Sequence, residues 1–138
     1  MKTERIHHWQ SALSKLVQER WHQPFAWGVQ DCFLWAADCV LTVTGEDVAS
    51  TERGAYNDAR SAARLVEELG GVAAIGASRF GAEVPVASAQ VGDVVLVRFD
   101  GRDTLAVCMG MHALGPGELG LVSVSMDDAL KVWRCTKD

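Results

Sequence analysis

Hydrophobic residues follow helical spacing in the first part of the chain and form short β-type runs in the last part. Between Thr3 and Arg20, apolar side chains recur every three or four positions, which predicts an amphipathic opening helix that Pro24 stops or turns. Its apolar positions are Ile6, Trp9, Leu13, Leu16 and Val17.

A second helix is predicted from Cys32 to Thr44. Asp31 precedes it as a side-chain cap for the first N–H groups, and Gly45 follows it as a residue that readily ends a helix. Apart from two threonines, Asp38 is the polar exception in this segment. Because the segment is apolar on nearly every side, we expect the helix to be buried.

The remaining chain is predicted to hold a polar loop, two more helices and several strands. Residues 46–57 form the loop, and residues 59–69 form a helix that Gly70 and Gly71 end. A shorter helix is expected over residues 72–80. From Val84 onward, the β-type runs are Val94–Val97, Leu105–Met109, Leu121–Val124 and Val132–Cys135.

This order of elements, with helices first and strands second, predicts an α+β domain. We expect the helices to pack on one face of a small antiparallel meander. With 138 residues, of which 49% are hydrophobic, the chain can build one compact core but not two. We therefore expect a single domain over 1–138, with an N-terminal helix (1–23), a helical part that contains Cys32 (24–82) and an antiparallel sheet (83–138).

Charge and hydropathy exclude some classes of partner. Thirteen basic residues against 18 acidic ones give a net charge of -5, and no basic run is placed to follow a phosphate backbone, so we expect no nucleic-acid partner. The first ten residues lack the apolar core of a signal peptide, and no stretch is apolar for long enough to span a bilayer. We expect a protein made in the cytoplasm, with free thiols.

The cysteine spacing is not typical of a metal site. Cys32 and Cys39 would lie roughly 10 Å apart on one helix, which prevents a disulfide between them. Close pairs such as C-x-x-C are missing, so we expect no metal and no cofactor. A metal or iron–sulfur clip remains a weaker alternative if all four cysteines meet in space: Cys32, Cys39, Cys108 and Cys135.

The segment from Pro24 to Cys32 carries the clearest chemical signal. It is an aromatic turn with Trp27 and Gly28 that delivers Cys32 to the first turn of a buried helix. Unpaired N–H groups and the helix dipole are expected to lower the pKa of the thiol there and to make it nucleophilic. From spacing alone, the competing interpretation, a small buried core residue, is favoured.

Neighbouring residues are interpreted mainly as structural. Cys39 shares a helix face with Cys32 and is expected in the core. Trp27 and Trp35 are candidates for a binding groove, although tryptophans in so small a chain mostly fill a core. Asp38 is expected to cap or pair at a helix surface.

The motif Phe25-x-Trp27-Gly28-x-x-Asp31-Cys32 resembles the one by which NlpC-type cell-wall cysteine peptidases present their nucleophile. Residues 91–96 (VGDVVL) resemble the Gly-Asp start of their first sheet strand. The resemblance runs from residue 24 to residue 126 and is closest to small members encoded among bacteriophage tail genes. It implies a papain-like fold with Cys32 at the nucleophile position.

The same resemblance implies a general-base histidine at the start of the next strand. Counting back from Gly110, this chain has Thr104 at that place, and threonine cannot take a proton from a thiol near neutral pH. His112 is a candidate substitute base, although the usual turn before it is missing. The other histidines precede the nucleophile and are expected on the surface: His7, His8 and His22.

Two functions of different classes follow from the resemblance. The first is a structural or assembly protein of a phage tail tip, a pseudoenzyme that is made in the bacterial cytoplasm, resides in the virion tail and binds other tail proteins. The second is an active cysteine hydrolase, a peptidase or amidase, in which Cys32 attacks peptide bonds of peptidoglycan with help from His112 and from N–H groups at the helix start. Because Thr104 stands at the place of the base, we favour the first function over the second.

Overall fold

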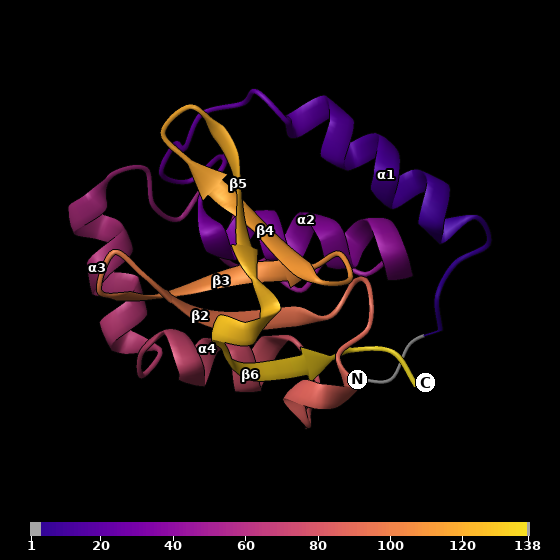
Figure 1. Cartoon of the computed structure of the whole chain (residues 1–138). Coiled ribbons are helices and arrows are strands. Elements are labelled where there is room, and N and C mark those ends of the chain that lie inside the picture. Colours follow the sequence, from indigo (N-terminus) through magenta and orange to yellow (C-terminus); the bar gives the residue numbers. More distant parts are fainter. Residues whose placement is uncertain (1–3, 138) are drawn as a thin grey trace.

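The computed structural model describes residues 4–137. In this part of the chain, four α-helices accompany a six-stranded antiparallel sheet, so the expected α+β class is confirmed (Figure 1). The helices are α1 (Trp9–Arg20), α2 (Cys32–Thr44), α3 (Ala59–Glu68) and α4 (Val72–Arg79). The strands are β1 (Ala82–Val84), β2 (Val94–Phe99), β3 (Arg102–Cys108), β4 (His112–Gly117), β5 (Gly120–Ser125) and β6 (Ala129–Arg134), with short 3-10 turns η1 (Val86–Ser88) and η2 (Met126–Asp128).

Helix α2 has the boundaries that the sequence predicts, and it is buried as expected. The side chain of Asp31 accepts a hydrogen bond from the Leu34 N–H, and Gly45 ends the helix with a φ of 81°. Trp35 is fully buried, and its indole N–H donates to the Leu114 carbonyl of β4 over 2.8 Å. Figure 1 shows α2 behind β3 and β4, so this hydrogen bond joins the helix to the sheet.

The sheet is a four-stranded meander, β2 to β5, with two further strands, β6 and β1, added beside β2. Its order is β1-β6-β2-β3-β4-β5, so β6 returns to pair with β2 instead of following β5 at the edge. The expected simple meander is wrong in this respect. Between β2 and β3, the Asp100-Gly101 turn has φ angles of 52° and 74°, which is the left-handed conformation that two-residue hairpins require.

The opening helix and two strands also differ from the sequence-based expectation. Helix α1 begins at Trp9, whereas Ile6 is exposed and its N–H donates to the Val43 carbonyl. The expected start at Thr3 lies outside the described residues. Strand β1 is only three residues long, and β4 contains glycines and a proline, so neither has the apolar run that marks a strand.

The sheet separates two clusters of buried side chains in the described chain, which we call the helix-side core and the outer-face core. Side chains of β3 alternate between them: Leu105 and Val107 belong to the helix-side core, and Ala106 and Cys108 to the outer-face core. Figure 1 shows β5 crossing in front of β2 and β3, and its Val124 packs against the outer-face core. The face on which a strand residue lies therefore decides whether it can meet α2.

Buried carboxylates are held by arginines. Asp93 is 2% exposed, and its carboxylate accepts hydrogen bonds from the guanidinium of Arg134. This pair joins the start of β2 to the end of β6. Glu52 is 4% exposed and accepts two hydrogen bonds from Arg79 of α4. Because a buried charge is costly without a partner, these pairs fix loop 46–57 and the sheet ends to the rest of the fold.

Gly76 of α4 provides a test of the helix–sheet packing. A Cβ atom at this position would overlap the indole ring of Trp133. We expect Gly76→Ala to lower the free energy of unfolding by about 1–3 kcal/mol in urea denaturation, because the overlap outweighs the better helix propensity of alanine. Ala77→Ser, an exposed change on the same helix, should alter it by less than about 0.5 kcal/mol. Equal effects of the two changes would contradict this packing.

Candidate functional site

The turn that precedes α2 is shaped by Gly28. Ala26 and Gln30 pair across it, and the Gln30 N–H donates to the Ala26 carbonyl over 2.8 Å. Gly28 has a φ of +78°, and a Cβ atom there would overlap the carbonyl oxygen of Tyr56. Glycine is therefore required both by the backbone conformation and by the close approach of loop 46–57.

Asp31 connects this turn to α2 and to Tyr56. Its carboxylate is 2% exposed and accepts hydrogen bonds from the N–H groups of Gly28 and Leu34, each over 2.9 Å. It also accepts the phenolic O–H of Tyr56 over 2.5 Å. Burial and the hydrogen bond to Asp31 raise the pKa of Tyr56 far above its ordinary value, so this phenol stays protonated.

Cys32 follows Asp31 and is half-buried. Burial raises the pKa of its thiol to about 11, and the adjacent Asp31 carboxylate acts in the same direction. Backbone hydrogen bonds of Leu105, Phe33 and Cys32 itself lower the pKa, but by less than burial raises it. The expected lowering of the Cys32 pKa at the helix start is therefore wrong, and the thiol is protonated at neutral pH.

Thr104 is not brought to Cys32. It lies on the outer face of β3, where it helps to line a small apolar hollow with Val97, Ala106 and Val124, and its hydroxyl donates to the Arg102 carbonyl. The next residue, Leu105, belongs to the helix-side core, and its backbone acts on the Cys32 thiol. An aliphatic residue therefore occupies the place on β3 that faces the start of α2.

His112 is also separated from Cys32. It is the first residue of β4, is exposed, and pairs with Ser125 of β5. A chain of contacts places His112 near the far end of α2. The next residue, Ala113, pairs with Cys108, and the Cys108 carbonyl accepts a hydrogen bond from the Gly92 N–H. Gly92 in turn lies against Val43, near the end of α2. Cys32 begins the same helix, so roughly 16 Å of helix axis separates the two ends.

The remaining histidines are on the surface, as expected: His7, His8 and His22 are exposed. All four histidines lie within residues 4–137, and none is among the groups that shift the Cys32 pKa. The site therefore joins Cys32 to a carboxylate, a phenol and backbone groups rather than to an imidazole.

The four cysteines do not meet. Cys39 and Cys135 lie in the helix-side core, whereas Cys108 lies in the outer-face core on the opposite side of the sheet. The four-cysteine clip is therefore wrong, and the cysteines are free thiols. Within the described residues, no group of three or more His, Cys, Asp or Glu side chains is placed to hold a metal ion.

Other candidates have structural surroundings. Asp38 pairs with Arg20 over 2.9 Å and with Arg53 over 2.7 Å, which confirms an ion pair at the helix surface. Trp35 fills the core, whereas Trp27 is 37% exposed and stands edge-on to Phe25 at 4.7 Å between ring centroids. No binding groove joins the two tryptophans in the described chain, because one is internal and the other external.

Two residues of the site, Tyr56 and Gln30, were not identified from the sequence. Tyr56 lies in a polar loop whose path back to Asp31 has no local signal, although it is the only tyrosine in the chain. Gln30 is fully buried, and its side-chain carbonyl accepts a hydrogen bond from Arg20 over 2.7 Å. Its position immediately before the Asp-Cys pair was a usable signal.

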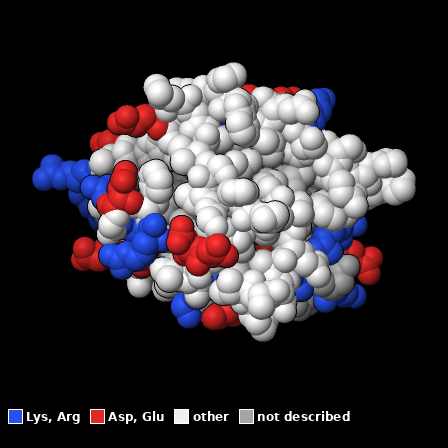
Figure 2. Space-filling view, in the orientation of Figure 1, with Lys and Arg blue, Asp and Glu red and all other residues white. Residues whose placement is uncertain are grey.

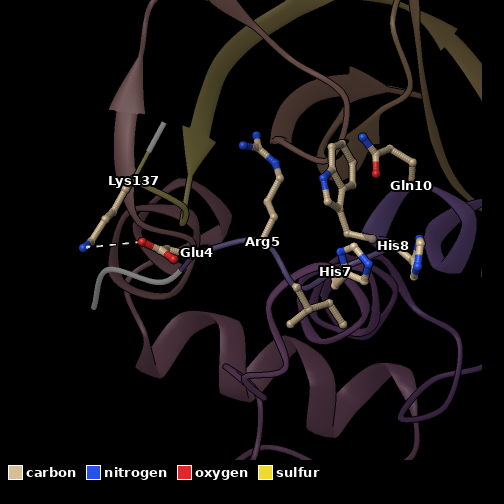
Figure 3. A pocket seen from close by; sticks show the side chains of 8 residues that line it. Glu4, Arg5, His7, His8, Gln10 and Lys137 are labelled. Carbon is tan, nitrogen blue, oxygen red and sulfur yellow. Dashed lines mark ion pairs between the residues drawn. The ribbon is translucent and has the colours of Figure 1, made fainter.

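A larger hollow, of about 730 Å³, lies away from the Cys32 site (Figure 3). The first described residues line it together with Lys137, and Figure 3 shows the ion pair of Lys137 with Glu4 at its rim. Arg5 is held over the Trp9 ring at 5.0 Å and donates to Gln90. Because the hollow is lined by residues 4–10 and Lys137 and by no residue of α2, it is not part of the candidate site.

No helix in residues 4–137 has the length and apolar character needed to cross a bilayer. The family model described as Domain of unknown function (DUF6950) matches residues 4–135. The chain belongs to this family. The DUF6950 match covers the turn before α2, Tyr56 and all six strands of the described sheet. A comparison with curated proteins found no match.

The hydrogen bond between Tyr56 and Asp31 is expected to stabilise the DUF6950 fold. Tyr56→Phe removes the O–H donor and leaves a buried carboxylate with one hydrogen bond fewer. We expect the free energy of unfolding to fall by about 1–3 kcal/mol in urea denaturation. Phe25→Leu, a change to a partly exposed aromatic residue just before the turn, is the control. A Tyr56→Phe variant as stable as the wild type would show that the hydrogen bond is not needed.

The raised pKa of Cys32 predicts slow alkylation. Thiolate is the reactive form, and its fraction near pH 7.5 falls as the pKa rises toward about 11. Because a more basic thiolate is intrinsically more nucleophilic, we expect iodoacetamide to modify Cys32 about tenfold more slowly in the folded protein than in urea. Site-specific mass spectrometry gives both rates. A faster reaction in the folded protein would indicate an activated thiol.

Proposed function

We propose that this DUF6950 protein is a non-catalytic structural or assembly component of a bacteriophage tail, with a papain-like fold of the NlpC type. Its partners are other tail proteins, and its place is the virion tail. The observation that carries the proposal is the protonated Cys32 thiol, held next to a carboxylate with no imidazole acting on it.

The chemistry of the site supports a non-catalytic role. Acyl transfer by a cysteine needs a thiolate and a base that can take and return a proton. The Tyr56 phenol keeps its proton and directs it at Asp31, and the Asp31 carboxylate is occupied by backbone and phenolic donors. The Leu34 N–H at the helix start is likewise bound to Asp31 and is not directed at a substrate carbonyl.

The retained motif has a packing role that accounts for its presence. Gly28 allows the turn to approach Tyr56, and Asp31 ties the turn, the loop and α2 together. Asp93, in the segment that resembles a Gly-Asp strand start, is bound by Arg134. The tail location rests on the resemblance of residues 24–126 to small tail-gene members of the NlpC-type group.

Peptidoglycan hydrolysis tests the absence of catalysis. We expect purified wild-type protein to release no more peptide from isolated sacculi than Cys32→Ala does, with mass spectrometry of the soluble fraction as the measurement. A lysozyme-treated sample controls for the accessibility of the wall. Release by the wild type that Cys32→Ala abolishes would overturn the proposal.

A complementation experiment tests the structural role. In a phage that lacks this gene, we expect electron microscopy to show particles without complete tails, and we expect the wild-type gene and Cys32→Ala to restore the same titre. Complete, infective tails in the absence of the gene would contradict a structural role, and failure of a folded Cys32→Ala protein to restore the titre would contradict the dispensability of the thiol.

A further inference from the structure

The two edges of the sheet are protected to different degrees. Strand β1, at one edge, is three residues long and is followed by Pro85. Its Glu83 lies 3.6 Å from Lys131 of β6. Short length, charge and proline are the means by which proteins prevent another strand from pairing with an exposed edge.

Strand β5, at the other edge, has none of these features. Its sequence, GLVSVS, contains no charged residue and no proline. Its pairing with β4 continues without a register shift from His112↔Ser125 to Gly117↔Gly120. The backbone of Trp21 and His22 covers the first two residues of this edge, which leaves the uncharged, regular residues 122–125 for another strand to pair with.

The free backbone groups of β5 point away from β4. The Leu121 N–H points away from β4 and donates to the Trp21 carbonyl over 3.0 Å, whereas the Met126 N–H, just after β5, points the other way and donates to the Met111 carbonyl just before β4. Because successive residues alternate, Ser123 and Ser125 direct their N–H groups outward like Leu121. In the described part of the chain, neither of these two N–H groups has a hydrogen-bond partner, and the Ser123 side chain is exposed.

Acidic residues flank this neutral edge. Glu118 precedes β5, and Asp127 and Asp128 follow it; all three are exposed and form no ion pair within residues 4–137. Figure 2 shows a broad uncharged area across the face on which β5 lies in Figure 1. A partner strand with a neutral centre and basic residues at its ends therefore matches the charges of this edge.

A second copy of the chain fits less well. Two β5 strands paired antiparallel about Ser123 would place Glu118 of one copy opposite Asp128 of the other at both ends. Like charges directly opposite each other destabilise a strand pair. The same charges attract lysine or arginine, so the edge favours a different, basic-flanked segment over self-association.

We propose that β5 is a docking edge for an extended segment of a partner protein, with a neutral β-forming centre flanked by Lys or Arg, which pairs with the outward N–H and C=O groups around Ser123. This inference deepens the proposed structural role and rests on it for the existence of a partner. The hydrogen-bonding edge supplies affinity, and the acidic flanks supply selectivity.

Two labelled peptides test the proposal by fluorescence anisotropy: Lys-Thr-Val-Thr-Val-Thr-Lys and its analogue with Glu at both ends. We expect the basic peptide to bind the full-length protein at least about tenfold more tightly at low salt. The double variant Glu118→Gln, Asp128→Asn should remove most of that difference. Equal affinities of the wild type for the two peptides, or no binding of the basic one up to about 1 mM, would overturn the proposal.

A matched pair of variants at one position tests the edge itself. Ser123→Pro removes the outward N–H but no hydrogen bond to β4, whereas Ser123→Thr keeps the N–H. We expect Ser123→Pro to weaken binding of the basic peptide at least about tenfold, and Ser123→Thr to change it by no more than about twofold. Near-UV circular dichroism confirms that both variants are folded. Unchanged binding by a folded Ser123→Pro protein would overturn the proposal.

Light scattering measures the oligomeric state and so tests whether β5 binds a second copy of the chain instead of a partner. We expect a monomer; a dimer that Ser123→Pro dissociates would show that the edge binds a second copy, contrary to the proposal. The two proposals can fail separately. Negative peptide-binding results would refute the docking edge but would not change the outcome of the peptidoglycan assay. Conversely, hydrolysis that depends on Cys32 would refute the proposed function without altering peptide binding at β5.

Discussion

The buried carboxylate of Asp31 is the interaction on which the surroundings of Cys32 depend. A carboxylate at 2% exposure is costly unless its oxygens are hydrogen-bonded, and here they accept hydrogen bonds from the turn, from the helix start and from Tyr56. These hydrogen bonds join the turn at Gly28, the start of α2 and the loop that contains Tyr56. They also place a negative charge beside Cys32, where it opposes the formation of a second one.

The position of a cysteine at a helix start is therefore not enough to activate it. The N–H groups and dipole of α2 do stabilise negative charge, but Asp31 already uses that stabilisation as the N-cap. Burial against the helix-side core then acts on the thiol without compensation from a cation. On β3, the aliphatic Leu105 faces this place, so packing occupies the space in which a proton-transferring group would have to lie.

Elements whose ends are set by neighbouring residues could be predicted from the sequence, whereas elements that depend on contacts between distant segments could not. Asp31 and Gly45 mark both ends of α2, because a cap and a left-handed glycine act within a few residues. Strand β4 was missed because its pairing with β3 and β5 outweighs the weak propensity of a segment rich in glycine and proline. The sign of the Cys32 pKa shift and the role of Tyr56 depend on burial and on contacts between distant segments, which spacing along the chain does not encode.

The protonation state of Cys32 is the central claim, and thiolate absorbance near 240 nm measures it directly. The difference in absorbance between the wild type and Cys32→Ala, followed against pH, isolates this thiol from the other three cysteines. The account predicts no thiolate signal from Cys32 at neutral pH and a midpoint near 11 in the folded protein. A midpoint below about 7, in the range of activated cysteines, would contradict it.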